Sequence, residues 1–452
     1  MDIVGGTGGT GLHARKHHKG SANNHADDTD DSHPQSPHRR RSRRYSRYLP
    51  SFLHSEVGVA FEIVVVFLVC GFLLGYLVLS HQHRHVMHFI SDPLGHLRLH
   101  GRAGFRHHFY SGQPRTVTVV LPSVVNPKNR KRRLDSIFET WGPNARAIYV
   151  VHNVSEFPQA DHHAVISEKS QPEDPYSYPQ ILLVPPSISF NDGLPRLNYV
   201  IRTVYEKVNP DFAFFVNDHT FVIPEHLCKY LEDKHPEEDM YHGHAMKNQK
   251  DIFNSGAAGY VLSRKTMQSL VQAWDKEDPT CLLKNGAKWL QGNPGLVTSK
   301  CLKEVLHVEA VDTRYHGKYH RFHAFPLTRV VSGAVDDWYK KKHEDMDKMM
   351  KTDASYNHLD SGVGCCAQET ISFHYVEYSE SRALFSTREA LIENPHMTDH
   401  ELKKEMIAKW PKDFKEIGGY SRGLPKEENK DDWETLLIVM RRISSRHTQR
   451  EC

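Results

Sequence analysis

Strand-like and helix-like segments alternate through the middle of this 452-residue chain, and that alternation limits the possible fold more than any other feature. Four runs rich in β-branched, aliphatic and aromatic residues have strand character: Thr116–Ser123, Arg146–Asn153, Gln180–Pro186 and Asp211–Asp218. Segments 129–142 and 191–210 lie between them and carry apolar residues at helical spacing. This order favours an α/β domain with a mostly parallel sheet and helices on both faces.

The last of these runs, "DFAFFVND", ends in polar residues where a buried strand would finish. Asn217, Asp218 and His219 follow five apolar residues directly, and the chain then turns apolar again. Ligands of open α/β sheets bind outside the carboxyl ends of the strands. The pattern therefore predicts a ligand site at this strand end.

A single long apolar run, Val57–Leu79, predicts a membrane-spanning helix. It contains one charged residue, Glu62, and would be about 30 Å long as a helix. A buried core helix is the alternative, but soluble helices are rarely apolar on every face. Arginines cluster before the run and histidines follow it, so the positive-inside rule predicts a single-pass type II topology with a cytosolic N-terminus.

The arginine cluster could also indicate a nuclear signal or a nucleic-acid contact. A net charge of +3 gives no overall signal for binding a polyanion, and the neighbouring apolar run favours the topological interpretation, so no nucleic-acid partner is expected. The topology predicts a Golgi or ER membrane protein whose main domain is lumenal. Six of the seven cysteines then lie in an oxidising compartment, and Asn153 is the predicted N-glycosylation site.

The composition divides the chain into five predicted parts. They are a disordered basic cytosolic tail (1–56), a transmembrane helix (57–79), a His-rich stem (80–114), a lumenal α/β domain (115–390) and a helical C-terminal extension (391–452). The tract "HQHRHVMH" in the stem could bind metal, but a solvated stem explains it better. The C-terminal helices are expected over Asp399–Trp410 and Asp431–Ile443 and are expected to pack against the main domain.

Four stretches, in order, resemble one known family. They are "FFVNDHTFVIPEHLCKYL", "NSGAAGYVLS", "HVEAVDTRYHGKYHRFHAF" and "GCCAQETISFHYVE". Together they resemble glycosyltransferase family 31, most closely its core 1 β1,3-galactosyltransferase branch, over about residues 115–380. The resemblance implies a Rossmann-like, glycosyltransferase A-type fold that binds a nucleotide sugar. It also implies transfer of a hexose, with galactose from UDP-galactose as the first candidate, through a β1,3 linkage onto an O-glycan such as GalNAc on Ser or Thr of a glycoprotein.

The family's chemistry implies a divalent cation, usually manganese, that bridges the phosphates of the UDP-sugar donor and neutralises charge as the bond breaks. When the family's motifs are matched to this sequence, the resemblance implies Asp218, His219 and His374 as metal ligands. It implies Asn217 and Asp218 as donor-binding residues. The family typically has three successive acids, whereas here Asn217 and His219 replace the first and third. This departure lowers the negative charge expected at the site.

A second departure concerns the general base of an inverting transfer. The family has a Glu-Asp pair before the cysteine that aligns with Cys301, and Pro294 and Gly295 stand at that place here. Another acid would have to substitute as the catalytic base, and Glu309 and Asp312 are the nearest candidates in sequence. Two hypotheses remain open: an active transferase, or a catalytically inactive relative with a chaperone-like or lectin-like role.

Aromatic residues late in the domain are candidates for stacking on an acceptor sugar. They are Trp338, Tyr339 and Tyr375, for which core packing is the alternative.

The cysteines carry three further expectations. Cys281 and Cys301 flank one segment and could close it with a disulfide. Cys365 and Cys366 match the family's double cysteine, and each is expected to pair with a distant partner because adjacent cysteines rarely bond to each other. Cys228 is expected to be a buried thiol.

Overall fold

The computed structural model describes residues 114–123, 127–153, 165–166, 179–248, 251–284, 293–337, 339–341, 361–412 and 423–445. The predicted cytosolic tail, the membrane helix over 57–79 and nearly all of the stem lie outside these residues. No helix in the part of the chain that the structure describes is long and apolar enough to span a membrane.

An eight-stranded sheet forms the centre of the domain. Its strands are β1 (Thr116–Leu121), β2 (Ile148–Asn153), β3 (Val165–Ile166), β4 (Gln180–Val184), β5 (Phe212–Asn217), β7 (Tyr241–Gly243), β10 (Tyr260–Ser263) and β11 (Val311–Asp312). The spatial order is β11-β7-β10-β5-β1-β2-β4-β3, and β10 alone runs antiparallel to its neighbours. The predicted mostly parallel α/β sheet is confirmed, and its four predicted strands are β1, β2, β4 and β5.

The direction of strand addition reverses between β1 and β5. From β1 the chain adds β2 and then β4 on one side, and it returns to add β5 on the other side of β1. β1 and β5 are parallel and in register from Thr116 opposite Phe212 to Leu121 opposite Asn217. Such a reversal is the topological switch point at which doubly wound sheets bind ligands. The predicted polar strand end therefore lies at this point of the sheet.

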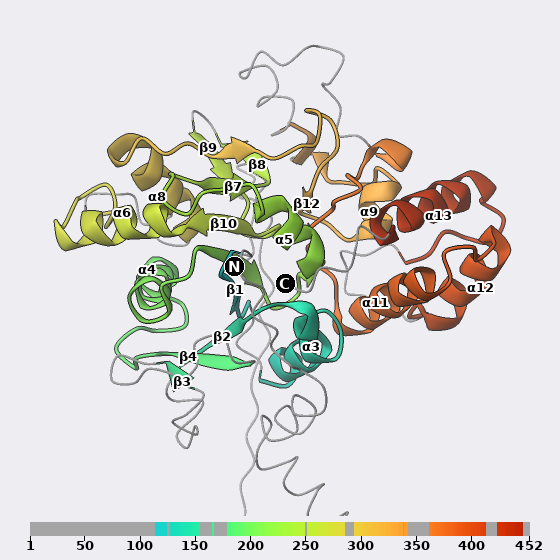
Figure 1. The fold of residues 1–452 in the computed structure, drawn as a ribbon, viewed down its shortest axis with the longest axis horizontal. Coiled ribbons are helices and arrows are strands. Elements are labelled where there is room, and N and C mark those ends of the chain that lie inside the picture. Colours follow the sequence, from blue (N-terminus) through green and yellow to red (C-terminus); the bar gives the residue numbers. More distant parts are fainter. Residues whose placement is uncertain are drawn as a thin grey trace, which may run out of the picture. The chain divides into compact units, whose positions relative to one another are not determined.

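Helices cover both faces of the sheet (Figure 1). The helices in the described part of the chain are α3 (Pro127–Glu139), α4 (Gly193–Thr203), α5 (Pro224–Leu231), α6 (Arg264–Asp275), α8 (Pro294–Lys300), α9 (Leu327–Val331), α11 (Tyr378–Glu393), α12 (Asp399–Lys409) and α13 (Lys430–Ser444). A π-helical turn, Val204–Val208, extends α4, and 3-10 turns lie at Gly142–Asn144 and Gly362–Gly364. A second π-helical turn, Cys301–Val305, follows α8.

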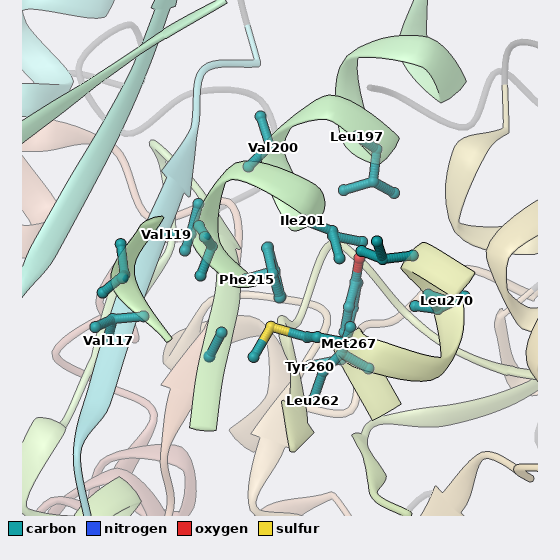
Figure 2. Close-up of a cluster of buried hydrophobic side chains, with 14 of the residues drawn as sticks. Val117, Val119, Leu197, Val200, Ile201, Phe215, Tyr260, Leu262, Met267 and Leu270 are labelled. Atoms are coloured by element: carbon teal, nitrogen blue, oxygen red, sulfur yellow. The ribbon is translucent and has the colours of Figure 1, made fainter. Parts of the chain in front are cut away.

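A cluster of buried hydrophobic side chains lies between the sheet and the helices α4 and α6 (Figure 2). Leu197, Val200 and Ile201 repeat at helical spacing on α4 and meet strand residues such as Val119 and Phe215. Burial of each of these side chains removes apolar surface from water, which stabilises the fold by roughly 25 cal/mol per Å² of buried surface. This packing fixes the strands whose ends carry the polar residues.

A small three-stranded sheet brings a late part of the chain to the end of β5. Its order is β12 (Phe322–His323), β13 (Ser372–Phe373) and β6 (Phe221–Val222). β13 pairs with β6 so that Phe373 lies opposite Phe221, and the amide of Val376 donates to the carbonyl of His219 at 3.0 Å. His374 is thereby placed beside the polar strand end. A separate hairpin joins β8 (Ala245–Asn248) to β9 (Asp251–Asn254).

The C-terminal helices pack against the main domain, as expected. α11 contacts α3 as well as α12 and α13, and α13 contacts α9. Arg442 on α13 donates to the carbonyl of Cys366 at 3.1 Å. The predicted boundary at residue 390 falls inside α11, so this helix continues from the domain into the extension.

The cysteine expectations have mixed outcomes. The Cys281–Cys301 disulfide is present, as predicted. The prediction of distant partners for Cys365 and Cys366 is wrong, because these two residues are bonded to each other. Both side chains are completely buried, and their Cα atoms lie only 3.7 Å apart because the two residues are adjacent in the chain. Cys228 is also disulfide-bonded, so the expectation of a buried free thiol is wrong as well.

Removing the Cys281–Cys301 bond should destabilise the domain clearly. The bond joins residues 20 apart in sequence, and constraining an unfolded loop of that size stabilises a protein by about 3 kcal/mol. We expect the double variant Cys281→Ala/Cys301→Ala to lose about that much in urea unfolding. The Cys365–Cys366 bond closes almost no loop, so the matched variant Cys365→Ala/Cys366→Ala should lose less stability from this effect. Equal losses would contradict the loop argument.

Candidate functional site

The ends of β1 and β5 are joined by backbone and side-chain hydrogen bonds. The amide of Asp218 donates to the carbonyl of Leu121 at 3.2 Å, and the amide of Thr220 donates back to the carbonyl of Asn217 at 3.1 Å. This tight turn directs the Asp218 side chain towards Ser123, which lies two residues beyond β1. Residues at the ends of both strands are therefore hydrogen-bonded to each other at the switch point.

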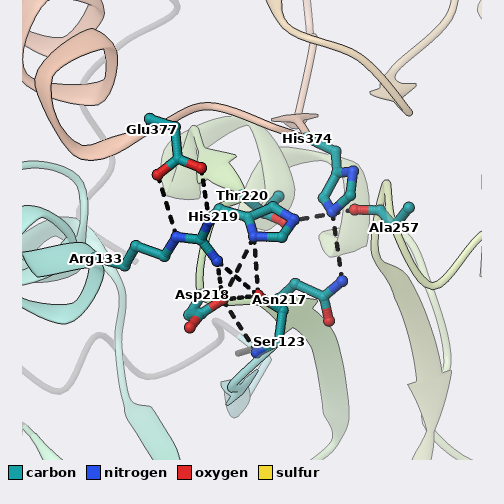
Figure 3. A network of polar contacts seen from close by, with 9 residues as sticks. All are labelled: Ser123, Arg133, Asn217, Asp218, His219, Thr220, Ala257, His374 and Glu377. Carbon is teal, nitrogen blue, oxygen red and sulfur yellow. Dashed lines mark hydrogen bonds and ion pairs between the residues drawn. The ribbon is translucent and has the colours of Figure 1, made fainter. Parts of the chain in front are cut away.

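The carboxylate of Asp218 is the centre of a polar network (Figure 3). Its Oδ1 accepts from the amide of Ser123 at 3.2 Å and from the Ser123 hydroxyl at 2.5 Å. Nη1 of Arg133 lies 3.5 Å from the same oxygen. The side chain is 0% exposed, and Oδ2 is buried without a hydrogen-bond partner among the described residues.

Arg133 connects this strand end to the start of α11. Its Nη2 and Nε donate to the two carboxylate oxygens of Glu377 at 2.6 and 3.2 Å, and its Nη1 donates to Ser123 Oγ at 2.8 Å. Burial opposes the charge on the guanidinium, but Asp218 and Glu377 outweigh burial and raise the pKa of Arg133 above its ordinary value. The network therefore contains one permanent cation and two carboxylates.

His219 is held as a neutral ring. Its Nδ1 lies 2.9 Å from Ser123 Oγ. Because the Ser123 hydroxyl donates its one proton to Asp218, the pattern of bonds assigns the ring proton to Nδ1 of His219. Burial, together with the nearby His374 and Arg133, holds the pKa of His219 well below its ordinary value. Its Nε2 is buried and has no hydrogen-bond partner within the described part of the chain.

His374 and Tyr375 reach the same place from the end of β13. The His374 ring centroid lies 4.4 Å from that of His219, and its Nε2 lies 3.4 Å from Nδ2 of Asn217. Burial lowers the pKa of His374 well below its ordinary value. Tyr375 has a left-handed backbone (φ 58°) and stacks on His219 at 5.3 Å. The predicted residues Asn217, Asp218, His219, His374 and Tyr375 are thus brought together.

The other two aromatic candidates have different outcomes. Trp338 lies outside the described residues. Tyr339 is 3% exposed, and its hydroxyl lies 2.7 Å from Nε2 of His244 while its ring packs edge-on against Phe325. Of the two roles that the sequence left open for Tyr339, these contacts support core packing.

The two candidate bases lie away from the network. Glu309 is exposed in the segment before β11. Asp312 lies on β11, three strands from β5 in the sheet order and so roughly 14 Å away at about 4.8 Å per strand. Its Oδ2 accepts from Nε of Arg314 at 2.7 Å. Pro294 and Gly295 form the first turn of α8, so no acid is supplied there.

The donor set at the strand end does not fit the predicted manganese site. Mn²⁺ favours several hard oxygen ligands, and Asp218 offers only Oδ2 because Ser123 and Arg133 occupy Oδ1. The guanidinium also places a positive charge where a cation would bind. Across the described ranges, no group of three or more His, Cys, Asp and Glu side chains could hold a metal ion. Asp218, His219 and His374 therefore lie close together without forming a three-ligand metal site.

The predicted glycosylation site, Asn153, ends β2 and is half-buried. Its sequon continues into residues outside the described ranges, so N-glycosylation of Asn153 stays a prediction.

Sequence reasoning did not identify Ser123, Arg133 or Glu377 as site residues. A signal for Arg133 exists, because it lies four and eight residues before the buried Ile137 and Trp141, on the inward face of α3. Glu377 had no comparable signal, since its position depends on the pairing of β13 with β6.

Acidification should lower the free energy of unfolding through a second group of buried histidines. Burial lowers the pKa of His244 to about 4, and burial together with His244 lowers the pKa of His323 to about 3. The unfolded chain binds these protons below about pH 6.5, whereas the folded chain does not. Stability should therefore fall by about 1 kcal/mol per histidine between pH 6.5 and 5.5. His323→Phe should unfold with a shallower pH dependence, and an unchanged slope would contradict this assignment.

Comparison with known proteins gives partial support for the expected family. No model of a known protein family matches the chain. A stretch of 173 residues, 37% of the chain, is 28% identical to the glycoprotein-N-acetylgalactosamine 3-beta-galactosyltransferase 1 of Xenopus laevis. The chain is similar to a galactosyltransferase. The match covers 42% of that relative, so the chain matches less than half of the relative's length.

Proposed function

We propose that this protein is a glycosyltransferase that binds a nucleotide sugar at the carboxyl ends of β1 and β5. One observation carries the proposal: Ser123, Asp218 and Arg133 form a buried polar network at the topological switch point of the sheet. Doubly wound sheets bind nucleotides at this point. The similarity to a galactosyltransferase supports the same reaction class.

The finer proposal is transfer of galactose from UDP-galactose through a β1,3 linkage onto GalNAc-Ser/Thr of a glycoprotein. The activity named for the Xenopus relative supports galactosyl transfer to GalNAc of a glycoprotein, and the resemblance of the four ordered motifs supports UDP-galactose as the donor. We further propose a Golgi or ER membrane location with the described domain in the lumen, on the basis of the apolar run over 57–79 and its flanking charges.

A catalytically inactive relative is the second candidate, and a specific observation favours it. Glu309 and Asp312 do not join the network, and the network's second carboxylate, Glu377, is bound by Arg133. An inverting transfer needs a carboxylate that can accept the proton of the acceptor hydroxyl. A protein that keeps the binding site without this base would act as a lectin or as a folding partner of an active transferase.

The test is transfer of labelled galactose by the full chain, purified in detergent, from UDP-galactose to a GalNAc-peptide. The assay is run with manganese and, in parallel, with EDTA. Product formation above that of heat-denatured protein is expected. Absence of transfer from a panel of UDP-sugars, by protein with intact far-UV circular dichroism, would reject the enzyme and leave the inactive relative.

Asp218→Asn should lower transfer at least tenfold. An amide cannot replace both the charge and the acceptor capacity that hold Ser123 and Arg133. Asp233→Asn is the matched control, because Asp233 is 78% exposed and pairs only with Lys234 in the described structure. The control should keep the rate of the unchanged protein. Equal activity of both variants would place the reaction elsewhere.

A further inference from the structure

The network at the ends of β1 and β5 contains its own cation. Arg133 is the one arginine or lysine that contacts Asp218 in the described structure, and it is 11% exposed. It touches the strand end through Ser123 and Asp218 and the start of α11 through Glu377. Contacts from three separate segments of the chain thus hold the positive charge of Arg133 in place.

The two carboxylates that hold Arg133 differ in accessibility. Asp218 is 0% exposed, whereas Glu377 is 22% exposed. Glu377 binds the Nε and Nη2 edge of the guanidinium with both oxygens. That edge is the fork with which arginine binds carboxylate or phosphate bidentately. An incoming phosphate can therefore replace Glu377 while Asp218 and Ser123 keep Arg133 in place.

We propose that Arg133 is the resident cation of this site, and that a nucleoside diphosphate binds its Nε and Nη2 edge in exchange for Glu377, without a divalent metal. The identity of the ligand rests on the proposed function, whereas the absence of a metal requirement does not. No bond is broken in this exchange, because one anion replaces another on the guanidinium. Asp218 is a positioning residue that orients Arg133.

The first experiment counts Mn²⁺ ions bound to the full chain, from the loss of the free-ion signal in electron paramagnetic resonance. The chain and its Asp218→Asn variant are compared, so that ions bound elsewhere, for example by the His-rich stem, cancel. Equal numbers of bound ions are expected. One additional ion on the unchanged chain would overturn the proposal.

The second experiment measures UDP binding by calorimetry, in EDTA and in Mn²⁺. The Kd values in the two conditions are expected to agree within twofold. Glu377→Gln should bind UDP at least threefold more tightly, because it removes a competing charge. Glu369→Gln is the matched control, since Glu369 is 19% exposed and pairs with Lys229 and Arg321, and it should leave the Kd unchanged.

Arg133→Lys keeps the charge without the bidentate fork and should weaken UDP binding at least threefold in the same measurement. A Kd that improves tenfold in Mn²⁺, or that Glu377→Gln leaves unchanged, would overturn the resident-cation proposal. Failure of every form of the chain to bind UDP would reject the proposed function and the phosphate exchange, while the Mn²⁺ count would still decide whether the site takes a metal.

Discussion

Gly259→Ala is expected to destabilise the domain by roughly 2–5 kcal/mol. The backbone of Gly259 is left-handed (φ +86°), which costs an alanine about 1–2 kcal/mol. A Cβ there would lie 2.6 Å from Cε2 of Phe214 and 2.9 Å from Cγ1 of Val216. Both side chains are fully buried on β5, so overpacking adds about 1–3 kcal/mol.

Gly256→Ala is the matched control for this substitution. It lies three residues earlier, and its added Cβ would come no closer than 4.0 Å to Cε1 of Tyr260. We expect its free energy of unfolding in urea to stay within about 0.5 kcal/mol of that of the unchanged chain. Similar urea midpoints for the two variants would show that β5 can move to accept the extra methyl group.

Arg133→Met is expected to cost about 3–5 kcal/mol, the usual result of removing one member of a buried ion pair. The substitution leaves the 0% exposed carboxylate of Asp218 without a compensating charge and frees Glu377. Arg202→Met is the control, because Arg202 is 32% exposed in its pairs with Glu206 and Asp275 and should lose only about 0–1 kcal/mol.

A double variant separates the buried charge from lost packing. Adding Asp218→Asn to Arg133→Met removes the uncompensated carboxylate, so part of the lost stability should return in urea unfolding. A double variant that is less stable by the full sum of the two single effects would show that the Arg133–Asp218 contact contributes little.

The sheet could be predicted from sequence where strands are long and buried on both faces. Val119 and Phe215 are examples, since each lies in a buried run of β-branched, aliphatic or aromatic residues that marks β1 or β5. Strands of two residues, such as β11 and β13, have no periodicity to detect. Their positions follow from long-range pairing, which a single sequence does not display.

The candidate site shows the same division. Asp218 and His219 were predicted because they follow a buried strand directly. Arg133 was not, because it stands among five basic residues on α3, and burial of one of them depends on the register of the helix against the sheet. Ser123 was placed at a strand end without a role, since its partner follows a strand almost a hundred residues later.

The pairing of β13 with β6 also makes the site a late product of synthesis. Asn217 and His374 meet across 157 residues, which a ribosome adds in roughly 8–30 s at about 5–20 residues per second. During that interval β1, β2, β4 and β5 can already form a sheet, while the Asp218 carboxylate still lacks His374 and Glu377. In the nascent domain, this strand end would thus stay incomplete and exposed to water until the last quarter of the chain has been synthesised. Truncations that spare every residue of the sheet but remove Glu377 should therefore damage the site as much as a substitution within it.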